Sequence, residues 1–154
     1  MKNLTRIALV SCLVSVLLHG YLTTHYYPLK FAAAEAPSMC NMGSKFNCDA
    51  VTASTYSAVM GVPLSILGGV SNLIIFLMLL VAWIEWTENS ERLRRWGVAL
   101  AGVSVLASLT MLGVSLFKLS TYCPFCIGLY VLSFVIFETS RRSLSEPLIK
   151  GLID

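Results

Sequence analysis

Four of the five cysteines fall into two closely spaced pairs. Cys40 and Cys48 bracket the segment CNMGSKFNC, and Cys123 and Cys126 close the motif CPFC. A C-x-x-C spacing closes a small ring and is typical of redox-active dithiols. Pro124 suits the first turn of a helix, where amide N–H groups stabilise a thiolate. The motif therefore predicts a redox pair at a helix start, with Cys126 one turn further in.

The loop pair leaves more than one interpretation open. Gly, Ser, Asn and Lys between Cys40 and Cys48 predict a flexible loop. Such a loop can bring two Cα atoms within the roughly 4.4–6.8 Å that a disulfide needs. A disulfide here could simply staple an external loop. C-x7-C with C-x2-C is poor spacing for zinc, so no metal site is expected.

The composition shows what must surround these cysteines. Of 154 residues, 56% are hydrophobic and only 12% are charged, and the mean hydropathy is +0.77. A soluble fold of this length could not bury that much apolar surface. No basic run with interleaved aromatic residues indicates nucleic-acid binding. Membrane lipid is therefore the expected surroundings.

Four apolar runs approach the roughly 20 residues that cross a bilayer as a helix. They cover Ile7–Tyr27, Val59–Trp83, Trp96–Phe117 and Cys123–Phe137. The sequence thus predicts an all-α membrane protein, a four-helix transmembrane bundle with a short periplasmic loop and half-helix. We expect that half-helix at about Asp49–Tyr56. Residues 1–142 would form the membrane domain, and residues 143–154 a cytoplasmic tail.

Basic residues predict the orientation, because Lys and Arg gather on the cytoplasmic side. With a cytoplasmic N-terminus, eight of the eleven basic residues lie inside and three outside. The inside set is Lys2, Arg6, Arg92, Arg94, Arg95, Arg141, Arg142 and Lys150, and the outside set is Lys30, Lys45 and Lys118. Both termini are then cytoplasmic, and both cysteine pairs face the periplasm of a cell inner membrane.

Two processing interpretations of the first segment compete with a retained span. Met1–Gly20 has the charged start of a signal peptide, and AAAEA at 32–36 offers small residues for cleavage. Leu9–Cys12 also resembles a lipoprotein box. The long apolar run favours a retained span, with Cys12 as a small buried hydrophobe.

Two dithiols on one side of a membrane predict a relay, in which thiolate attack moves a disulfide from one pair to the other. The inner pair then needs a two-electron acceptor that dissolves in lipid. No haem-type His pair or dinucleotide Gly fingerprint is present, so a quinone is the expected acceptor. Tyr130 lies on the helical face of Cys126 and could donate to a quinone carbonyl, or could be an ordinary core tyrosine.

Other polar and small residues have structural interpretations. His19 and His25 are expected at the outer interface. Glycines in the second and third spans are expected to permit close helix packing. These glycines are Gly68, Gly69, Gly102 and Gly113.

From roughly Thr5 to Arg142, the sequence resembles the bacterial form of the vitamin K epoxide reductase family. The resemblance depends on the order of several motifs. They are the pair Cys40 and Cys48, the run Cys48-Asp49-Ala50-Val51 leading to Ser54, the run Gly61-Val62-Pro63-Leu64, and Cys123-Pro124-Phe125-Cys126.

The resemblance implies roles for individual residues. Cys40 would face a thioredoxin-fold partner, Cys48 would bridge to Cys123, and Cys126 would face the quinone. Ser54 would match the family's loop serine. Tyr130 would match its quinone-side tyrosine. The quinone would be ubiquinone or menaquinone.

The sequence as a whole predicts a membrane thiol:quinone oxidoreductase. It would reoxidise a periplasmic thioredoxin-fold thiol oxidase, supplied in trans because no thioredoxin domain follows the fourth span. Asn72 lies near the position of an asparagine in the mammalian enzymes without a secure alignment to it, so plain quinone reduction is favoured over epoxide reduction. The alternatives are a true quinone-epoxide reductase, a non-enzymatic scaffold with structural disulfides, and a sensor or transporter subunit.

Overall fold

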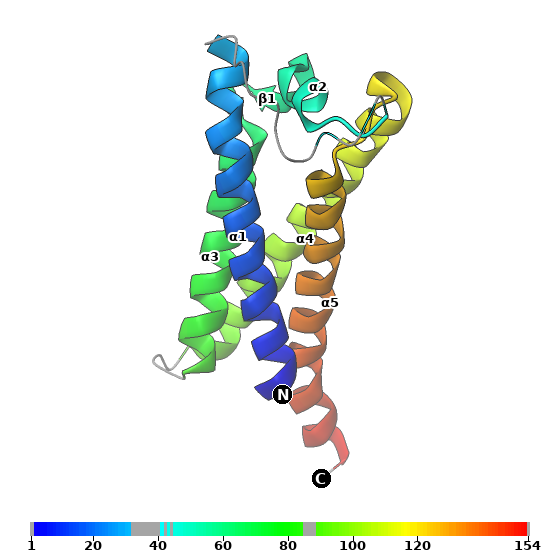
Figure 1. The fold of residues 1–154 in the computed structure, drawn as a ribbon. Coiled ribbons are helices and arrows are strands. Elements are labelled where there is room, and N and C mark those ends of the chain that lie inside the picture. The colour runs from blue at the N-terminus through cyan, green and yellow to red at the C-terminus, as the bar shows by residue number, and fades with distance from the viewer. Residues whose placement is uncertain (1, 32–40, 42, 44, 85–88, 154) are drawn as a thin grey trace.

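The protein is a bundle of four long helices (Figure 1). The structure is a computed structural model that describes residues 2–31, 41, 43, 45–84 and 89–153. The long helices are α1 (Lys2–Phe31), α3 (Leu64–Trp83), α4 (Ser90–Val114) and α5 (Pro124–Ile153). The start of α1 and the end of α5 lie at one end of the bundle, here called the inner end (Figure 1). The opposite, outer end carries the short helix α2.

All four long helices are long and apolar enough to cross a membrane, by length and composition. Each also presents large apolar side chains outward. Leu17, Leu106 and Val131, for example, are 66%, 65% and 59% exposed. In water such surfaces would be unfavourable, whereas lipid chains can cover them. The predicted all-α membrane bundle is confirmed.

The second span begins at Leu64, so the predicted start at Val59 is wrong. A two-stranded antiparallel hairpin, β1 (Ala58–Val59) and β2 (Val62–Pro63), precedes it. Met60 and Gly61, which join the strands, have positive φ angles of 52° and 82°. Two consecutive left-handed residues reverse the chain as in a tight hairpin turn, so the helix can start only after Pro63.

The last two spans also run past their predicted limits. α4 starts at Ser90 and continues into η2 (Ser115–Leu119), a π-helical turn. α5 begins at Pro124, as the CPFC motif predicted, but continues beyond Phe137. Because this helix runs on to Ile153, the division at residue 142 stays a prediction.

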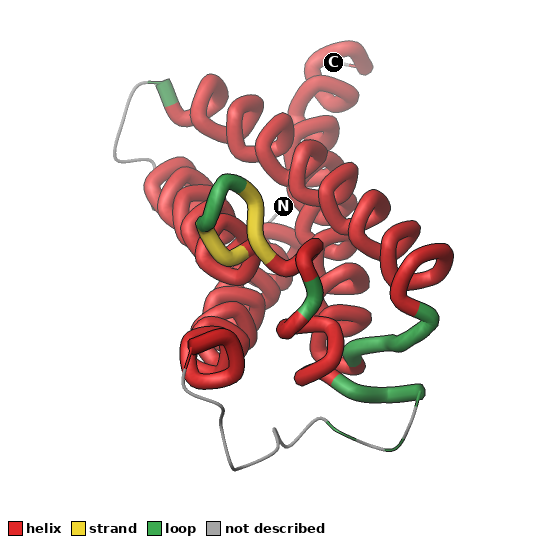
Figure 2. The backbone as a smooth tube through the Cα atoms, turned by 90° about the horizontal axis from the view of Figure 1, so that it is seen from above, coloured by secondary structure: helices red, strands yellow, loops and turns green. Residues whose placement is uncertain are grey.

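The half-helix predicted at Asp49–Tyr56 is present as two shorter turns. α2 (Cys48–Ala53) is followed by η1 (Thr55–Ser57). Both lie over the outer end of the bundle, as Figure 2 shows from above. The ammonium group of Lys30, near the end of α1, donates to the carbonyl oxygens of Ala53 and Ser54 at 3.4 and 3.3 Å.

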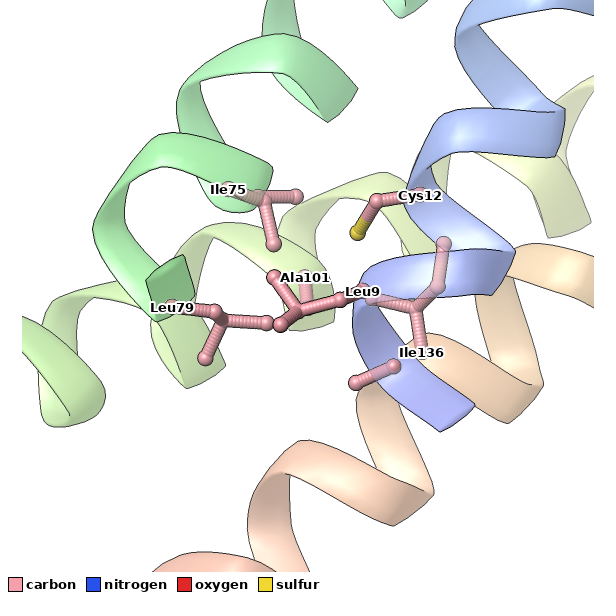
Figure 3. Close-up of a cluster of buried hydrophobic side chains, with 7 residues drawn as sticks. Leu9, Cys12, Ile75, Leu79, Ala101 and Ile136 are labelled. Atoms are coloured by element: carbon pink, nitrogen blue, oxygen red, sulfur yellow. The ribbon is translucent and has the colours of Figure 1, made fainter. Parts of the chain in front are cut away.

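The inner half of the bundle is filled by a cluster of small and branched side chains (Figure 3). Its buried members are Ala8, Leu9, Cys12, Ile75, Leu79, Ala101 and Ile136. Cys12 is fully buried there and free, which confirms its interpretation as a small hydrophobe.

The glycines predicted to allow helix packing differ in their surroundings. A Cβ on Gly102 would lie 3.4 Å from the ring of Phe137. Gly68 and Gly69 lie under His19 of α1. Gly113 has no neighbour within 4 Å of such a Cβ, so it permits no close contact.

The arrangement of ends predicts opposite results for reporters placed at them. An alkaline phosphatase domain inserted at Lys45 should be active. The basic residues gather at the inner end, which favours a cytoplasmic inner end and an external outer end. The same domain inserted at Asn89, in the α3–α4 connection, should be inactive. Enzyme activity in intact cells measures this, with a cytoplasmically active fluorescent reporter as the control. An active phosphatase at Asn89 would overturn the orientation.

Candidate active site

Two cysteines from distant parts of the chain meet at the outer end. The Sγ atoms of Cys48 and Cys123 are 3.2 Å apart, and their side chains are only 1% and 3% exposed. Cys48 is disulfide-bonded, whereas Cys123 and Cys126 are free. Since an S–S bond is about 2.05 Å long, a shift of about 1 Å would bring the two sulfurs to bonding distance, and thiol exchange at Cys48 would break its existing disulfide. Cys40 lies outside the described residues.

A short backbone pairing creates this contact. Phe46 and Tyr122 form an isolated parallel bridge. The N–H of Asn47 donates to Tyr122 O at 3.0 Å, and the N–H of Tyr122 donates to Lys45 O at 2.8 Å. Because the two segments run in the same direction, the residues that follow them, Cys48 and Cys123, enter the bundle side by side.

Side-chain caps fix the loop on the cysteine side of this pairing. Asn47 caps α2, and its Oδ1 accepts the N–H of Ala50 at 2.9 Å. Asn41 Oδ1 accepts the N–H of Cys48 at 3.0 Å. Caps of this kind satisfy amide groups that a helix start leaves without partners. Cys48 is therefore held at the first position of a well-capped helix.

The surroundings of Cys123 favour its thiolate. A hydrogen bond from the Cys126 thiol lowers the pKa of Cys123, and the N–H groups of Cys126 and Phe125 lower it further, although burial acts in the opposite direction. The N–H of Cys126 lies 3.2 Å from Cys123 Sγ. Thiolate is the form that attacks a disulfide, so Cys123 is prepared to exchange with Cys48.

A cavity of about 320 Å³ lies beside the cysteines, between the four long helices. Its wall includes Cys123, Cys126 and Tyr130, and most of the remaining lining is apolar. The volume falls at the lower end of the roughly 300–1,000 Å³ typical of small-molecule sites. Tyr130 thus shares a cavity with Cys126, as its place on the same helical face predicted.

Asn72 is a polar residue of the cavity wall that the sequence did not predict as part of the site. It lines the cavity and is only 3% exposed. Its Nδ2 donates to Gly68 O at 2.9 Å, and no hydrogen bond to its amide oxygen is found among the described residues. Its place in the middle of an apolar run is a signal that could have identified it.

Two predicted positions differ from the structure. Ser54 ends α2, its hydroxyl donates to Val51 O at 2.7 Å, and it is not among the residues that line the cavity. Ser57, one turn later, does line it. His19 was expected at the interface but lies in the cavity wall, because α1 extends one helical turn beyond the predicted limit at Tyr27 and so places His19 deeper.

Within the part of the chain that the structure describes, no group of three or more His, Cys, Asp or Glu side chains could hold a metal ion. The zinc interpretation of the cysteines therefore gains no support from the described residues.

Comparison with known families identifies the architecture. A family model described as the vitamin K epoxide reductase family matches residues 6–140. The chain belongs to this family. The match spans nearly the whole range over which the resemblance was predicted, and it includes both cysteine pairs. A search of curated proteins finds no match. Members of the vitamin K epoxide reductase family are membrane oxidoreductases that act on thiols, disulfides and quinones.

The 3.2 Å contact predicts a specific cross-link. In a Cys40→Ala, Cys126→Ala variant, mild oxidation should join Cys48 to Cys123 in most molecules, because no competing thiol remains in either pair. Mobility on non-reducing gels and mass spectrometry of linked peptides would measure it. The matched control, Cys40→Ala with Cys123→Ala, should cross-link far less, since Cys126 lies one turn deeper. Equal cross-linking in both variants would contradict the geometry.

Proposed function

We infer that this protein is a thiol:quinone oxidoreductase that reoxidises a thioredoxin-fold partner during disulfide formation. The observation that carries this proposal is the buried contact of 3.2 Å between Cys48 and Cys123, with Cys126 in the wall of an adjoining cavity. The contact allows exchange between the two pairs. The cavity offers space for an oxidant next to the deeper thiol.

The proposed exchange proceeds in four steps. The dithiol of the reduced partner reduces the loop disulfide through Cys40 and becomes a disulfide itself. Cys48 thiolate then attacks Cys123 in the inner disulfide, which forms a Cys48–Cys123 bond and releases Cys126 as a thiolate. Attack of Cys40 on Cys48 restores the loop disulfide and leaves the inner pair as a dithiol. That dithiol transfers two electrons and two protons to a quinone, yielding hydroquinone and the inner disulfide.

The cavity has the features that a quinone requires. Its apolar lining suits a flat ring, and Tyr130 offers a hydroxyl donor beside Cys126. Leu67 of α3 and Val103 of α4 line the cavity and are also 43% and 59% exposed. An isoprenoid tail can therefore extend from the cavity into the membrane between these helices. Ubiquinone and menaquinone both fit this description.

The proposed location is a cell inner membrane, with the termini in the cytoplasm and the cysteines on the periplasmic side. The excess of basic residues at the inner end supports this orientation. The partner is a thioredoxin-fold thiol oxidase acting in trans, because such a protein presents the accessible dithiol that the loop pair needs.

Two other functions make different demands on the site. A scaffold with structural disulfides would keep its two pairs apart, whereas here Cys123 is free beside a disulfide-bonded Cys48. Epoxide reduction would use the same cavity, and Asn72 in its wall is the observation that favours this second candidate.

The direct test is turnover with purified protein. A reduced thioredoxin-fold oxidase and short-chain ubiquinone should yield one hydroquinone per partner disulfide. The loss of quinone absorbance measures this reaction. Cys123→Ala should lower the rate at least about 100-fold, because the relay loses its connecting sulfur. Cys12→Ala is the control and should leave the rate within about twofold, because Cys12 belongs to the separate inner cluster. A fully active Cys123→Ala variant would refute the relay.

A spectroscopic experiment tests which thiol meets the quinone. Cys126 lies three residues beyond Cys123, about 4.5 Å deeper along the helix at 1.5 Å per residue. Cys123→Ser leaves Cys126 free, and its thiolate beside an electron-poor ring should produce a visible charge-transfer absorption. Cys126→Ser should show none under any redox condition. Colour only in Cys126→Ser would reverse the assignment.

A further inference from the structure

Among the described residues, the ionisable side chains that α1 contributes to the cavity wall are His19 and Tyr26. The His19 ring packs against α3, where two consecutive glycines leave room for it. A Cβ on Gly68 would lie 2.0 Å from His19 Nε2, and a Cβ on Gly69 would lie 3.2 Å from His19 Cβ. The ring is therefore held in a slot that only a glycine pair provides.

The hydrogen bonds of His19 determine its tautomer. Nδ1 lies 2.8 Å from Ser15 O. A carbonyl oxygen only accepts, so Nδ1 must carry the hydrogen. No acidic side chain lines the cavity among the described residues, and a second proton would place an unpaired charge in an apolar site. The neutral ring therefore has a lone pair on Nε2.

Among the described residues, no group forms a hydrogen bond with the Nε2 lone pair. Nε2 is the ring atom nearest to the Gly68 position, and His19 and Gly68 both line the cavity. Nε2 is not one of the fully buried polar atoms without a partner. Nε2 is thus a hydrogen-bond acceptor at the cavity wall, within reach of an occupant of the cavity.

We propose that His19 holds the hydroquinone by accepting a hydrogen bond from its ring hydroxyl, and so makes the cavity selective for the reduced product. This inference depends on the proposed function. A hydroquinone O–H donates to a lone pair, whereas a quinone carbonyl has only lone pairs of its own and is repelled. The same atom therefore distinguishes the two redox forms of one ring.

The position of His19 suits this role. It lies at the α1–α3 side of the bundle, packed on Gly68, whereas Cys126 and Tyr130 belong to α5. A para-hydroquinone carries its two oxygens at opposite ends of the ring. One oxygen can face the α5 side, where electrons arrive, while the other faces Nε2.

Selectivity for the product would favour the forward reaction. Preferential binding of hydroquinone raises the two-electron reduction potential of the bound ring, by about 30 mV for a tenfold difference in affinity. Within the complex, the equilibrium between the inner dithiol with bound quinone and the inner disulfide with bound hydroquinone then shifts toward the disulfide. His19 is in this sense a positioning residue and takes no part in the sulfur chemistry.

The test compares two binding constants in a redox-inert background, Cys123→Ser with Cys126→Ser, of the full chain in detergent. Titration calorimetry without oxygen gives the Kd of ubiquinone-1 and of ubiquinol-1 separately. His19→Phe keeps a ring over Gly68 but has no nitrogen. It should weaken ubiquinol binding about five- to tenfold, as expected for one lost hydrogen bond, and change ubiquinone binding less than about twofold.

Three further variants separate hydrogen bonding from packing. Gly68→Ala should expel the ring and give the same selective loss with His19 intact. Gly113→Ala is the matched glycine control, because a Cβ there meets nothing within 4 Å, and both constants should stay unchanged. His19→Gln offers an amide oxygen as an acceptor and should restore part of the ubiquinol affinity.

The possible outcomes separate the two proposals. If His19→Phe weakens both forms equally, or neither, or only ubiquinone, the selective contact is refuted although the cavity still binds quinone. If the background protein binds neither form, the quinone site itself is wrong, and the proposed function fails with it.

Discussion

The pairing of residues 45–47 with Tyr122 is the constraint on which the outer end depends. Two backbone hydrogen bonds fix the register of segments that are more than 70 residues apart. Since the pairing is parallel, Cys48 and Cys123 enter the bundle together and their sulfurs come within 3.2 Å. If the two paired segments ran in opposite directions, or if their register slipped by one residue, the same cysteines would point apart. The proposed relay would thus depend on a few main-chain contacts made outside the helices.

The bundle is divided along its length into two parts with different packing. Toward the outer end the helices enclose a cavity, and polar groups such as Tyr130 and Asn72 are spaced around its wall. Toward the inner end, small residues such as Ala8 and Ala101 let the helices pack closely around a buried apolar cluster. Because van der Waals packing is a principal attraction between helices in lipid, the filled half stabilises the bundle around the hollow half.

Much of the fold could be predicted because it depends on local chemistry. Apolar length identified the spans, and Pro124 in a C-x-x-C motif marked the start of α5. The hairpin before α3 was missed because its residues are as apolar as the helix that follows, and only the left-handed Met60 and Gly61 separate them. The pairing of Phe46 with Tyr122 depends on distant parts of the chain, and a single sequence contains no sign of it. The depth of His19 was missed because α1 ends at Phe31, one turn later than the apolar run predicted.

The filled inner half has an electrical consequence. Leu9, Ile75 and Ile136 are buried apolar side chains at the centre of the bundle, where a charged species would be unfavourable (Figure 3). In the proposed reaction, protons released from the thiols and protons taken up by the quinone would therefore belong to the same, outer side. Electrons and protons would move together over a short path, and no net charge would traverse the bilayer. Sulfur oxidation in this protein would then proceed at the same rate whether the membrane is energised or not.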